Sequence, residues 1–390
     1  MKRLIVLVAA LGAACSGSKG SGGGAGSGVA GATAGGGSGG GLSGAAGVSS
    51  AAGAAGEAVA GSAGDAGASG STGAAGLGGS GGSGGASVAS KCPAGTFTAP
   101  TLTGLQPQRL ANVPPADDFA NGFSIIEGPV WVSGTLFVSQ FGSTSRPPTS
   151  RLLSIVPGMS AAVANADFGS NGMAVDAQGN LIVAVHKDGS IRRVPPQMPS
   201  TSTVIASQYM GKRFNAPNDV TIRADGTVYF SDPDNYQSPQ PSPQTHPRVY
   251  RVSPAGAVSV VDETIGQPNG VTLSLDEKTL FVDGDAGLFS FAVMPDGSTG
   301  PKAPFGTSSA TSGSDGMTMD CAGDLYVVHG ADVIVLGPTG TELGRITLTG
   351  VQAASNVAFG GADRKTLFIT TLDAKPGVYQ VALPVPGLPF

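Results

Sequence analysis

The sequence predicts an all-β domain behind a low-complexity N-terminal quarter. Three observations lead to this prediction. A short pattern of paired apolar strands recurs along the last three quarters of the chain, helical periodicity is nearly absent, and the first 90 residues lack the apolar content of a folded domain. No apolar pattern with a 3.6-residue period extends beyond a turn or two, and the 28 prolines would interrupt most candidate helices.

The first 15 residues, MKRLIVLVAALGAAC, are typical of an export signal. Two basic residues precede an apolar stretch from Leu4 to Ala14, which is too short to span a bilayer as a helix. The small residues before Cys15 resemble the cleavage box of bacterial lipoproteins, although Gly12 replaces the usual leucine. We therefore expect residues 1–15 to be a signal peptide and Cys15 a lipidation site on a bacterial cell-envelope lipoprotein. Simple periplasmic or secreted export is the alternative.

Residues 16–91 are almost entirely Gly, Ala and Ser. This composition cannot bury enough apolar surface to offset backbone entropy, so a disordered tether is expected. Residues 92–390 remain as one large domain. Net charge is −5 with 12% charged residues and no basic cluster, which argues against nucleic acid as a partner and limits membrane contact to the lipid anchor. We expect a monomer.

The domain contains two cysteines, Cys92 and Cys321. In an exported protein such a pair is more often bridged than free, so a disulfide between them is expected. Two buried free thiols are the alternative.

The domain repeats one unit six times, and each unit is a polar corner, an apolar strand, a tight turn and a second apolar strand. The units start 41 to 51 residues apart, with the sequences EGPVWVSGTLFVSQ, NGMAVDAQGNLIVAV, NDVTIRADGTVYFSD, NGVTLSLDEKTLFVDG, DGMTMDCAGDLYVVHG and NVAFGGADRKTLFITT. Strand pairs at this period are typical of a β-propeller, with one four-stranded blade per period. A six-bladed β-propeller is predicted; a seventh blade would have to come from residues 97–115, which lack a corner. We expect this segment and the strand from Val378 to close the ring and protect its edges.

The first residue of each unit, called here a corner residue, is a side-chain oxygen donor. The six corner residues are Glu127, Asn171, Asn218, Asn269, Asp315 and Asn356. Since the innermost strands of a propeller line its axis, equivalent residues meet at one end of the channel. Such a set of hard oxygens, without His or Cys, favours Ca²⁺; Mg²⁺, Mn²⁺ and Zn²⁺ are alternatives.

Turn preference is the competing explanation for the corners, because Asn-Gly and Asp-Gly form turns for conformational reasons alone. It fits Asn171 and Asn356 best. It does not explain a glutamate at position 127, nor the proline that stiffens both Pro217-Asn218 and Pro268-Asn269.

The motifs EGPVW, GKRFNAPNDV with YFSDP, PNGVTLSLDEKTLFV, and DGMTMDCAGDLYV with NVAFGGADRKTLFIT resemble the gluconolactonase family, which includes regucalcin (senescence marker protein). The similarity covers about residues 123–381. It implies a six-bladed propeller that holds a divalent cation at its axis through Glu127, Asn218, Asn269 and Asp315. It also implies that Asp315 is both ligand and catalytic base, and that Asn218 faces substrate as well as metal.

The resemblance has departures that concern the substrate. In animal members an arginine lies two residues before Asn218, where this chain has Ala216, and the loop to Pro247 is particular to this chain. Four further residues are candidates for substrate binding. They are Asn171, His186, Arg213 and Asp232.

A metal-dependent hydrolase that opens a sugar lactone with a cation-activated water is the leading hypothesis for function. Its small-molecule partner would be a lactone. The first alternative is an organophosphate or ester hydrolase on the same site. The second is a propeller without catalytic activity that binds at the cell surface and is stabilised by calcium.

Overall fold

The computed structural model describes residues 91–110, 125–142, 148–235, 237–307 and 311–388. All of the described residues belong to one compact unit. The predicted signal peptide, Cys15 and nearly all of the tether lie outside the described residues. Within the described part of the chain, we find no helical stretch with both the length and the hydrophobicity needed to cross a bilayer.

Regular structure in the described residues is almost entirely antiparallel β-strand, and four of the sheets have four strands each. The second sheet along the chain contains β6 (Ser170–Val175), β7 (Leu181–Val185), β8 (Ser190–Val194) and β9 (Thr203–Ala206). The third contains β12 (Val220–Ile222), β13 (Val228–Asp232), β14 (Arg248–Val252) and β15 (Val258–Asp262). The fourth contains β16 (Val271–Leu273), β17 (Thr279–Gly284), β18 (Gly287–Val293) and β19 (Thr299–Pro304). The fifth contains β20 (Met317–Met319), β21 (Leu325–His329), β22 (Asp332–Leu336) and β23 (Glu342–Thr347).

The remaining large sheet has eight strands and consists of two four-stranded halves. One half contains β2 (Ile125–Val132), β3 (Thr135–Phe141), β4 (Ser150–Ile155) and β5 (Ala162–Asn165). The other contains β24 (Ala353–Gly360), β25 (Thr366–Leu372), β26 (Val378–Ala382) and β1 (Gln108–Arg109). In the described residues, the strand pairing that joins the two halves is that of Ile125 with Leu372. A small hairpin is formed by β10 (Gln208–Tyr209) and β11 (Lys212–Arg213).

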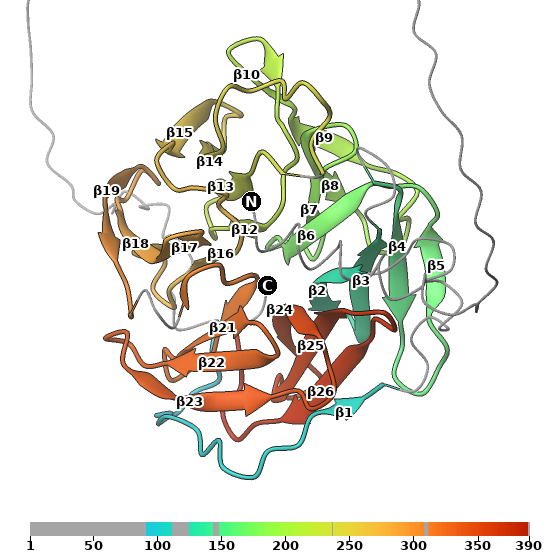
Figure 1. Ribbon diagram of the computed structural model, residues 1–390, viewed down its shortest axis with the longest axis vertical. Helices are drawn as coiled ribbons and strands as arrows, with labels where there is room; N and C mark the ends of the chain where they lie inside the picture. The colour runs from blue at the N-terminus through green and yellow to red at the C-terminus, as the bar shows by residue number, and fades with distance from the viewer. Residues whose placement is uncertain (1–90, 111–124, 143–147, 236, 308–310, 389–390) are drawn as a thin grey trace, which may run out of the picture. The chain divides into compact units, whose positions relative to one another are not determined.

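The first strands of the sheets follow one another around a common centre. Contacts run from β2 to β6, β12, β16, β20 and β24, and from β24 back to β2. Figure 1 shows β2, β6, β12, β16 and β24 around the centre, with β5, β9, β15, β19 and β23 at the periphery. The prediction of an all-β fold of small antiparallel sheets is confirmed. Each predicted repeat corresponds to the first hairpin of one sheet or half-sheet.

Apolar packing lies between neighbouring sheets. One cluster joins Ile182 and Ile191 of the second sheet to Phe230 and Tyr250 of the third. Another joins Tyr326 of the fifth sheet to residues of β24 and β25. Because each strand buries alternate residues on each of its faces, the two flanking sheets cover both faces of a hairpin.

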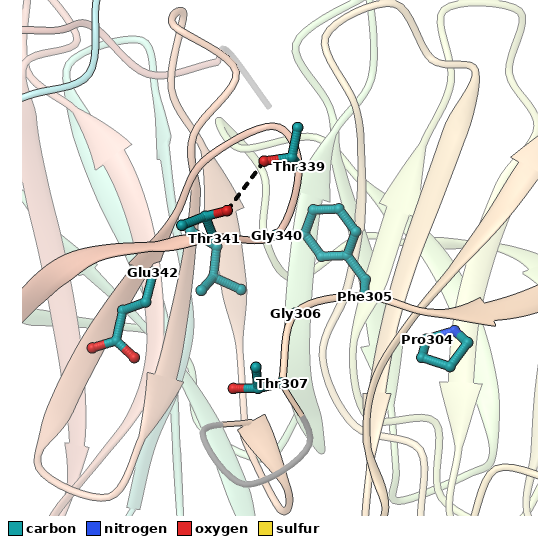
Figure 2. Close-up of a pocket in the computed structure, with 9 residues that line it drawn as sticks. Pro304, Phe305, Gly306, Thr307, Thr339, Gly340, Thr341 and Glu342 are labelled. Atoms are coloured by element: carbon teal, nitrogen blue, oxygen red, sulfur yellow. Dashed lines mark hydrogen bonds between the residues drawn. The ribbon is translucent and has the colours of Figure 1, made fainter.

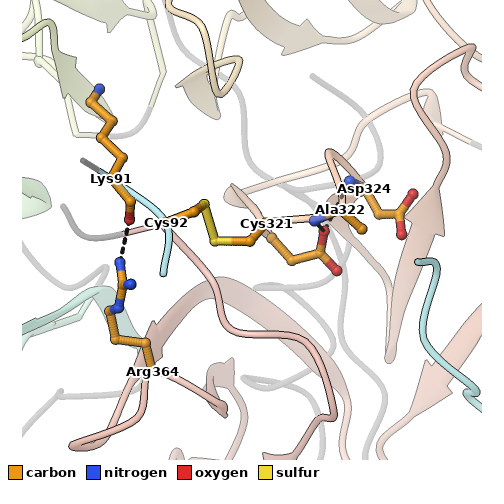
Figure 3. Close-up of a disulfide and its surroundings, with 7 residues drawn as sticks. Lys91, Cys92, Cys321, Ala322, Asp324 and Arg364 are labelled. Atoms are coloured by element: carbon orange, nitrogen blue, oxygen red, sulfur yellow. Dashed lines mark hydrogen bonds between the residues drawn. A yellow bond between two sulfur atoms is a disulfide. The ribbon is translucent and has the colours of Figure 1, made fainter. Parts of the chain in front are cut away.

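Both ends of the described chain pack near the turns that follow the first strands. Cys92 forms a disulfide with Cys321, the pair for which a bridge is expected, and their Cα atoms are 5.8 Å apart. Beside it, Arg364 donates a hydrogen bond to the carbonyl of Lys91 (Figure 3). The Cys321 N–H donates to Pro386 O at 2.8 Å. Further along, β1 pairs with β26, so the N-terminal segment covers the outer edge of the last half-sheet, in agreement with the expected edge protection.

Candidate functional site

The corner residues all lie at one end of the innermost strands, which we call the corner end. Glu127, Asn171 and Asn356 sit inside β2, β6 and β24, at places where a β-bulge shifts the strand register. The other three, Asn218, Asn269 and Asp315, each lie two residues before β12, β16 and β20. Bulges and strand starts interrupt the ladder of backbone hydrogen bonds and redirect side chains. The local structure therefore turns these polar residues out of the sheets.

Backbone contacts join neighbouring corners around the centre. The Gly172 N–H donates to Asn218 O at 2.7 Å, and the Gly316 N–H donates to Ser355 O at 2.9 Å. A Cβ atom at Gly128, which has φ +53°, would lie 2.3 Å from Asn171 O. Only glycine permits this approach at a positive φ, which explains the Glu-Gly sequence of the first corner.

Hydroxyl side chains hold the corner backbone in place. Ser139 Oγ donates to Asn171 O at 2.6 Å, Ser231 Oγ to Asn269 O at 2.5 Å, and Ser355 Oγ to Ile126 O at 2.5 Å. Each of these bonds links one sheet to the corner of a neighbour. Buried backbone carbonyls need such donors, so the bonds fix the direction of the corner side chains.

Glu127 and Asp315, the two predicted carboxylate ligands, both have a pKa raised well above the ordinary value. Glu127 is 5% exposed and accepts hydrogen bonds from Gly128 N at 2.9 Å and from Asn356 Nδ2 at 3.1 Å. Burial raises the pKa of Glu127 well above its usual range, and the negative charge of Asp315 raises it further. Burial also raises the pKa of Asp315, and the Asn269 side chain opposes this shift through a hydrogen bond.

Two more carboxylates, Asp219 and Asp283, raise the pKa of these residues. Asp219 Oδ1 accepts from Val220 N at 3.0 Å and Oδ2 from Val271 N at 3.1 Å, and burial raises its pKa to about 7. Asp283 is fully buried, and burial followed by the charge of Asp219 raises its pKa well above the ordinary value. Asp283 is also the charge that raises the Asp315 pKa most.

These carboxylates have no countercharge among their main electrostatic partners in the described chain. The charges that most affect Glu127, Asp283 and Asp315 are other carboxylates. Buried charges of one sign need a compensating charge or bound protons. A hard divalent cation fits this set of carboxylate and carboxamide oxygens.

The predicted ligand set mixes two acids, Glu127 and Asp315, with two amides. In the described residues, no three His, Cys, Asp or Glu side chains converge closely enough to hold a metal by themselves. The amides of Asn218 and Asn269 would therefore be essential donors. Asn218 is 7% exposed, whereas Asn269 and Asp315 are half-buried, so the corner end is most open on the side of the fourth and fifth sheets.

Asn171 is turned toward the loop that follows β13. Its Nδ2 donates to Gln237 Oε1 at 3.2 Å, and the residue is 1% exposed. The loop also receives a hydrogen bond from Gln267 Nε2 to Asp234 O at 3.0 Å. This loop therefore lies against corners on both sides of the third sheet, and substrate contact by Asn171 stays a prediction.

Two of the other candidates for substrate binding, Asp232 and Arg213, support the backbone that leads to Asn218. The two carboxylate oxygens of Asp232 accept from Asn215 N at 2.9 Å and from Ala216 N at 2.8 Å, and burial raises its pKa to about 7. Arg213 Nε donates to Phe214 O at 3.0 Å, and its Nη2 to His186 O at 3.3 Å. Their contact with substrate stays a prediction.

His186 is fully buried. Its Nε2 lies 3.1 Å from Pro148 O, and its ring packs edge-on against Phe141 with centroids 5.0 Å apart. Burial lowers its pKa to about 4, so the ring is neutral near pH 7. These contacts favour a structural role over a place on the channel wall.

Asp283 lies in the fourth repeat and was not among the residues predicted for the site. One signal was available, since the aligned second-strand residue is a hydroxyl in three other repeats, Ser139, Ser231 and Thr370. An acid at that position stands out once the strands are aligned.

One cavity of the described structure lies away from the corner residues. It measures about 410 Å³, is open, and lies between the edges of the fourth and fifth sheets, beside Phe305 and Glu342 (Figure 2). A second cavity of about 20 Å³ lies between first strands and is lined by Asp219, Thr272 and Asn356 among others. It has room for one water molecule.

Comparison with known proteins places this all-β chain with an oxygen-lined corner end in a family. Residues 164–373 match the SMP-30/Gluconolactonase/LRE-like region. The chain belongs to this family, which confirms the prediction made from its motifs. The gluconolactonase of Zymomonas mobilis is 28% identical over 285 residues, covering 66% of this chain and 78% of that protein.

Two further relatives carry related names. The pentonolactonase XacC of Haloferax volcanii is 28% identical over 206 residues, covering 51% of this chain and 66% of that protein. The solved structure of a gluconolactonase from Xanthomonas campestris aligns with a TM-score of 0.58 at 26% identity, covering 74% of this chain and 99% of the other.

Proposed function

We propose that this chain is a lactonase that hydrolyses sugar lactones at the corner end of a six-bladed propeller. The observation that carries the proposal is the gathering of Glu127, Asn218, Asn269 and Asp315 at one end of successive first strands. The family membership and the relatives named gluconolactonase and pentonolactonase support the reaction and the substrate class.

The proposed six blades are the four separate sheets and the two halves of the eight-stranded sheet. The single pair between Ile125 and Leu372 supports treating those halves as neighbouring blades. The closed series of contacts from β2 to β24 and back supports a ring. In such a ring the last blade takes strands from both ends of the chain, as β1 and β26 do.

We propose that a divalent cation, most readily Ca²⁺, binds through oxygens of Glu127, Asn218, Asn269 and Asp315. Mg²⁺, Mn²⁺ and Zn²⁺ are the alternatives. Two carboxylates balance the charge of one divalent cation, and neutral amide oxygens complete the shell without adding repulsion. When bound, the cation would polarise the lactone carbonyl and lower the pKa of a water molecule beside it.

Asp315 is the proposed general base. The water oxygen bonds to the carbonyl carbon while the Asp315 carboxylate takes the water proton. The ring C–O bond then breaks, and the proton passes to the leaving ring oxygen, which gives the open hydroxy acid. Asp315 is half-buried at the open side of the site, where substrate and water can reach it. A nearby positive charge would favour its ionised form against the effect of burial.

The proposal is tested by assaying aldonolactones and a phosphotriester with and without a chelator. Lactone hydrolysis that stops on chelation and returns with calcium is the expected result. Hydrolysis of the phosphotriester alone would favour the organophosphatase alternative. Absence of any turnover, with a melting temperature that still rises with calcium, would indicate a binding propeller instead.

We also propose that the domain is exported, tethered by residues 16–91 and anchored through a lipid on Cys15. The disulfide between Cys92 and Cys321 supports an oxidising compartment. Labelling cells with a radioactive fatty acid tests the anchor, because Cys15→Ser should abolish incorporation. A wild-type chain that is exported without label would leave secretion as the answer.

A further inference from the structure

Asp283 occupies a position that the other repeats fill without charge. It lies on β17, the second strand of the fourth sheet, one residue beyond Val282, which pairs with Val271. The aligned residues in the other repeats are Ser139, Ala184, Ser231, Val328 and Thr370. Serine, alanine, valine and threonine all support a corner at this position, so the fold itself does not require an acid there.

The hydroxyls at this position form bonds different from those of Asp283. Ser139 and Ser231 donate to the backbone carbonyl of the next corner, and Thr370 donates to Asn356 O at 3.2 Å. Asp283 instead accepts from Gly270 N at 2.8 Å through Oδ1. It therefore fixes the peptide directly after Asn269.

The second carboxylate oxygen of Asp283 is a buried acceptor without a donor. The side chain is fully buried, and Oδ2 has no hydrogen-bond partner in the described chain. Leaving a buried charged acceptor unsatisfied is unfavourable for folding. The negative charges of Asp219 and Glu127 further disfavour the ionised form of Asp283. A buried aspartate with a free oxygen and negative neighbours indicates that a positive charge from outside the described chain binds near it.

We propose that Asp283 is a positioning residue of the cation site, which orients Asn269 through the Gly270 N–H and adds negative charge to the field at the bound divalent cation. This inference rests on the proposed function. Asp283 acts through Asn269 and through the field at the site rather than as a ligand, in keeping with the absence of a three-acid cluster among described residues. Carboxylates behind metal ligands commonly tune affinity in this way.

The test is calcium titration by calorimetry of wild type, Asp283→Asn and a matched control. Asparagine keeps the shape and the acceptor for Gly270 N but removes the charge. The control is Asp324→Asn, because Asp324 is 1% exposed and its Oδ2 also lacks a partner in the described chain, but it follows the turn at the other end of β20. We expect Asp283→Asn to bind calcium about 10- to 100-fold more weakly, and Asp324→Asn to bind as wild type does.

The outcomes separate this inference from the proposed function. If wild type binds calcium and Asp283→Asn binds it equally well, the positioning role is wrong while the cation site stands. If wild type binds no divalent cation at all, the proposed site itself is wrong, and the inference fails with it. A purely structural role would lower the melting temperature of the calcium-free protein and leave the affinity unchanged. Should the asparagine variant not fold, Asp283→Ser copies Ser139 and Ser231 and is titrated in its place.

Discussion

Acidic side chains at the two ends of the first strands are used differently. The end of each first strand that leads into the tight turn is called here the turn end. There, Asp320 accepts hydrogen bonds from Ala322 N and Asp324 N and from the Tyr326 hydroxyl. Asp176 likewise caps its own turn and pairs with Arg193 at 2.8 Å. At the corner end, acids from separate sheets instead raise one another's pKa.

The difference identifies which acids the fold needs. Turn acids satisfy nearby backbone N–H groups, which is the ordinary reason for aspartate in a tight turn. The corner acids raise one another's pKa, and Asp283 keeps one oxygen without a partner in the described chain. Under the proposed function, the corner acids serve the cation, whereas turn acids such as Asp320 and Asp176 stabilise the protein.

The largest expected effect tests the corner end. Asp315→Asn should lower kcat for an aldonolactone by about 100- to 10,000-fold, since it removes the proposed base while keeping an oxygen donor. Calcium should still raise the melting temperature of the variant. Unchanged turnover would remove Asp315 from the chemistry.

The turn end should respond in stability rather than in turnover. Replacing both Cys92 and Cys321 with serine opens a loop with a sequence separation of 229 residues. The chain-entropy argument predicts a loss of about 5 kcal/mol in the free energy of unfolding, read from denaturant titrations. Turnover at low temperature should stay close to wild type. A double variant as stable as wild type would mean that the bridge does not pin the N-terminal segment.

Stability against pH should report on the buried acids without any substitution. Burial raises the pKa of Asp219 and Asp232 to about 7, so the folded cation-free protein holds protons that the unfolded chain releases near pH 4. Its free energy of unfolding should therefore fall as pH rises from about 4 to 7. Calcium, which binds the ionised form, should flatten this fall. A cation-free protein that becomes more stable over the same range would contradict these shifts.

The smallest effect concerns a single turn acid. Asp320→Asn keeps Oδ1 as the acceptor for two backbone N–H groups but replaces Oδ2, which accepts from the Tyr326 hydroxyl, with an N–H donor. A loss of about 1 kcal/mol is therefore expected in the free energy of unfolding. Calcium affinity, measured by calorimetry, should not change. A large loss of affinity would show that the two ends are coupled.

Much of this arrangement is predictable from the sequence, because the repeats carry it. Alternating apolar residues predict the hairpins, and alignment of the repeats places Glu127 and Asp315 at equivalent corners. Once the sheets are expected to follow one another around a common centre, equivalent positions are expected at the same end, and no further sequence signal is needed.

Contacts between repeats were not predictable in this way. The bond from Asn171 to Gln237 depends on the path of a long loop, and the bonds of Asp232 to Asn215 and Ala216 depend on local backbone geometry. No periodic signal encodes either feature. The isolation of Asp283 Oδ2 is a property of packing, which appears only in three dimensions.

A crystal structure of the calcium-soaked protein, with anomalous scattering to locate the ion, tests the central claim most directly. The account predicts one cation at the corner end with oxygens of Glu127, Asn218, Asn269 and Asp315 in its shell and at least one position left for water or substrate. A cation bound elsewhere, or these four side chains too far apart to share one ion, would contradict it.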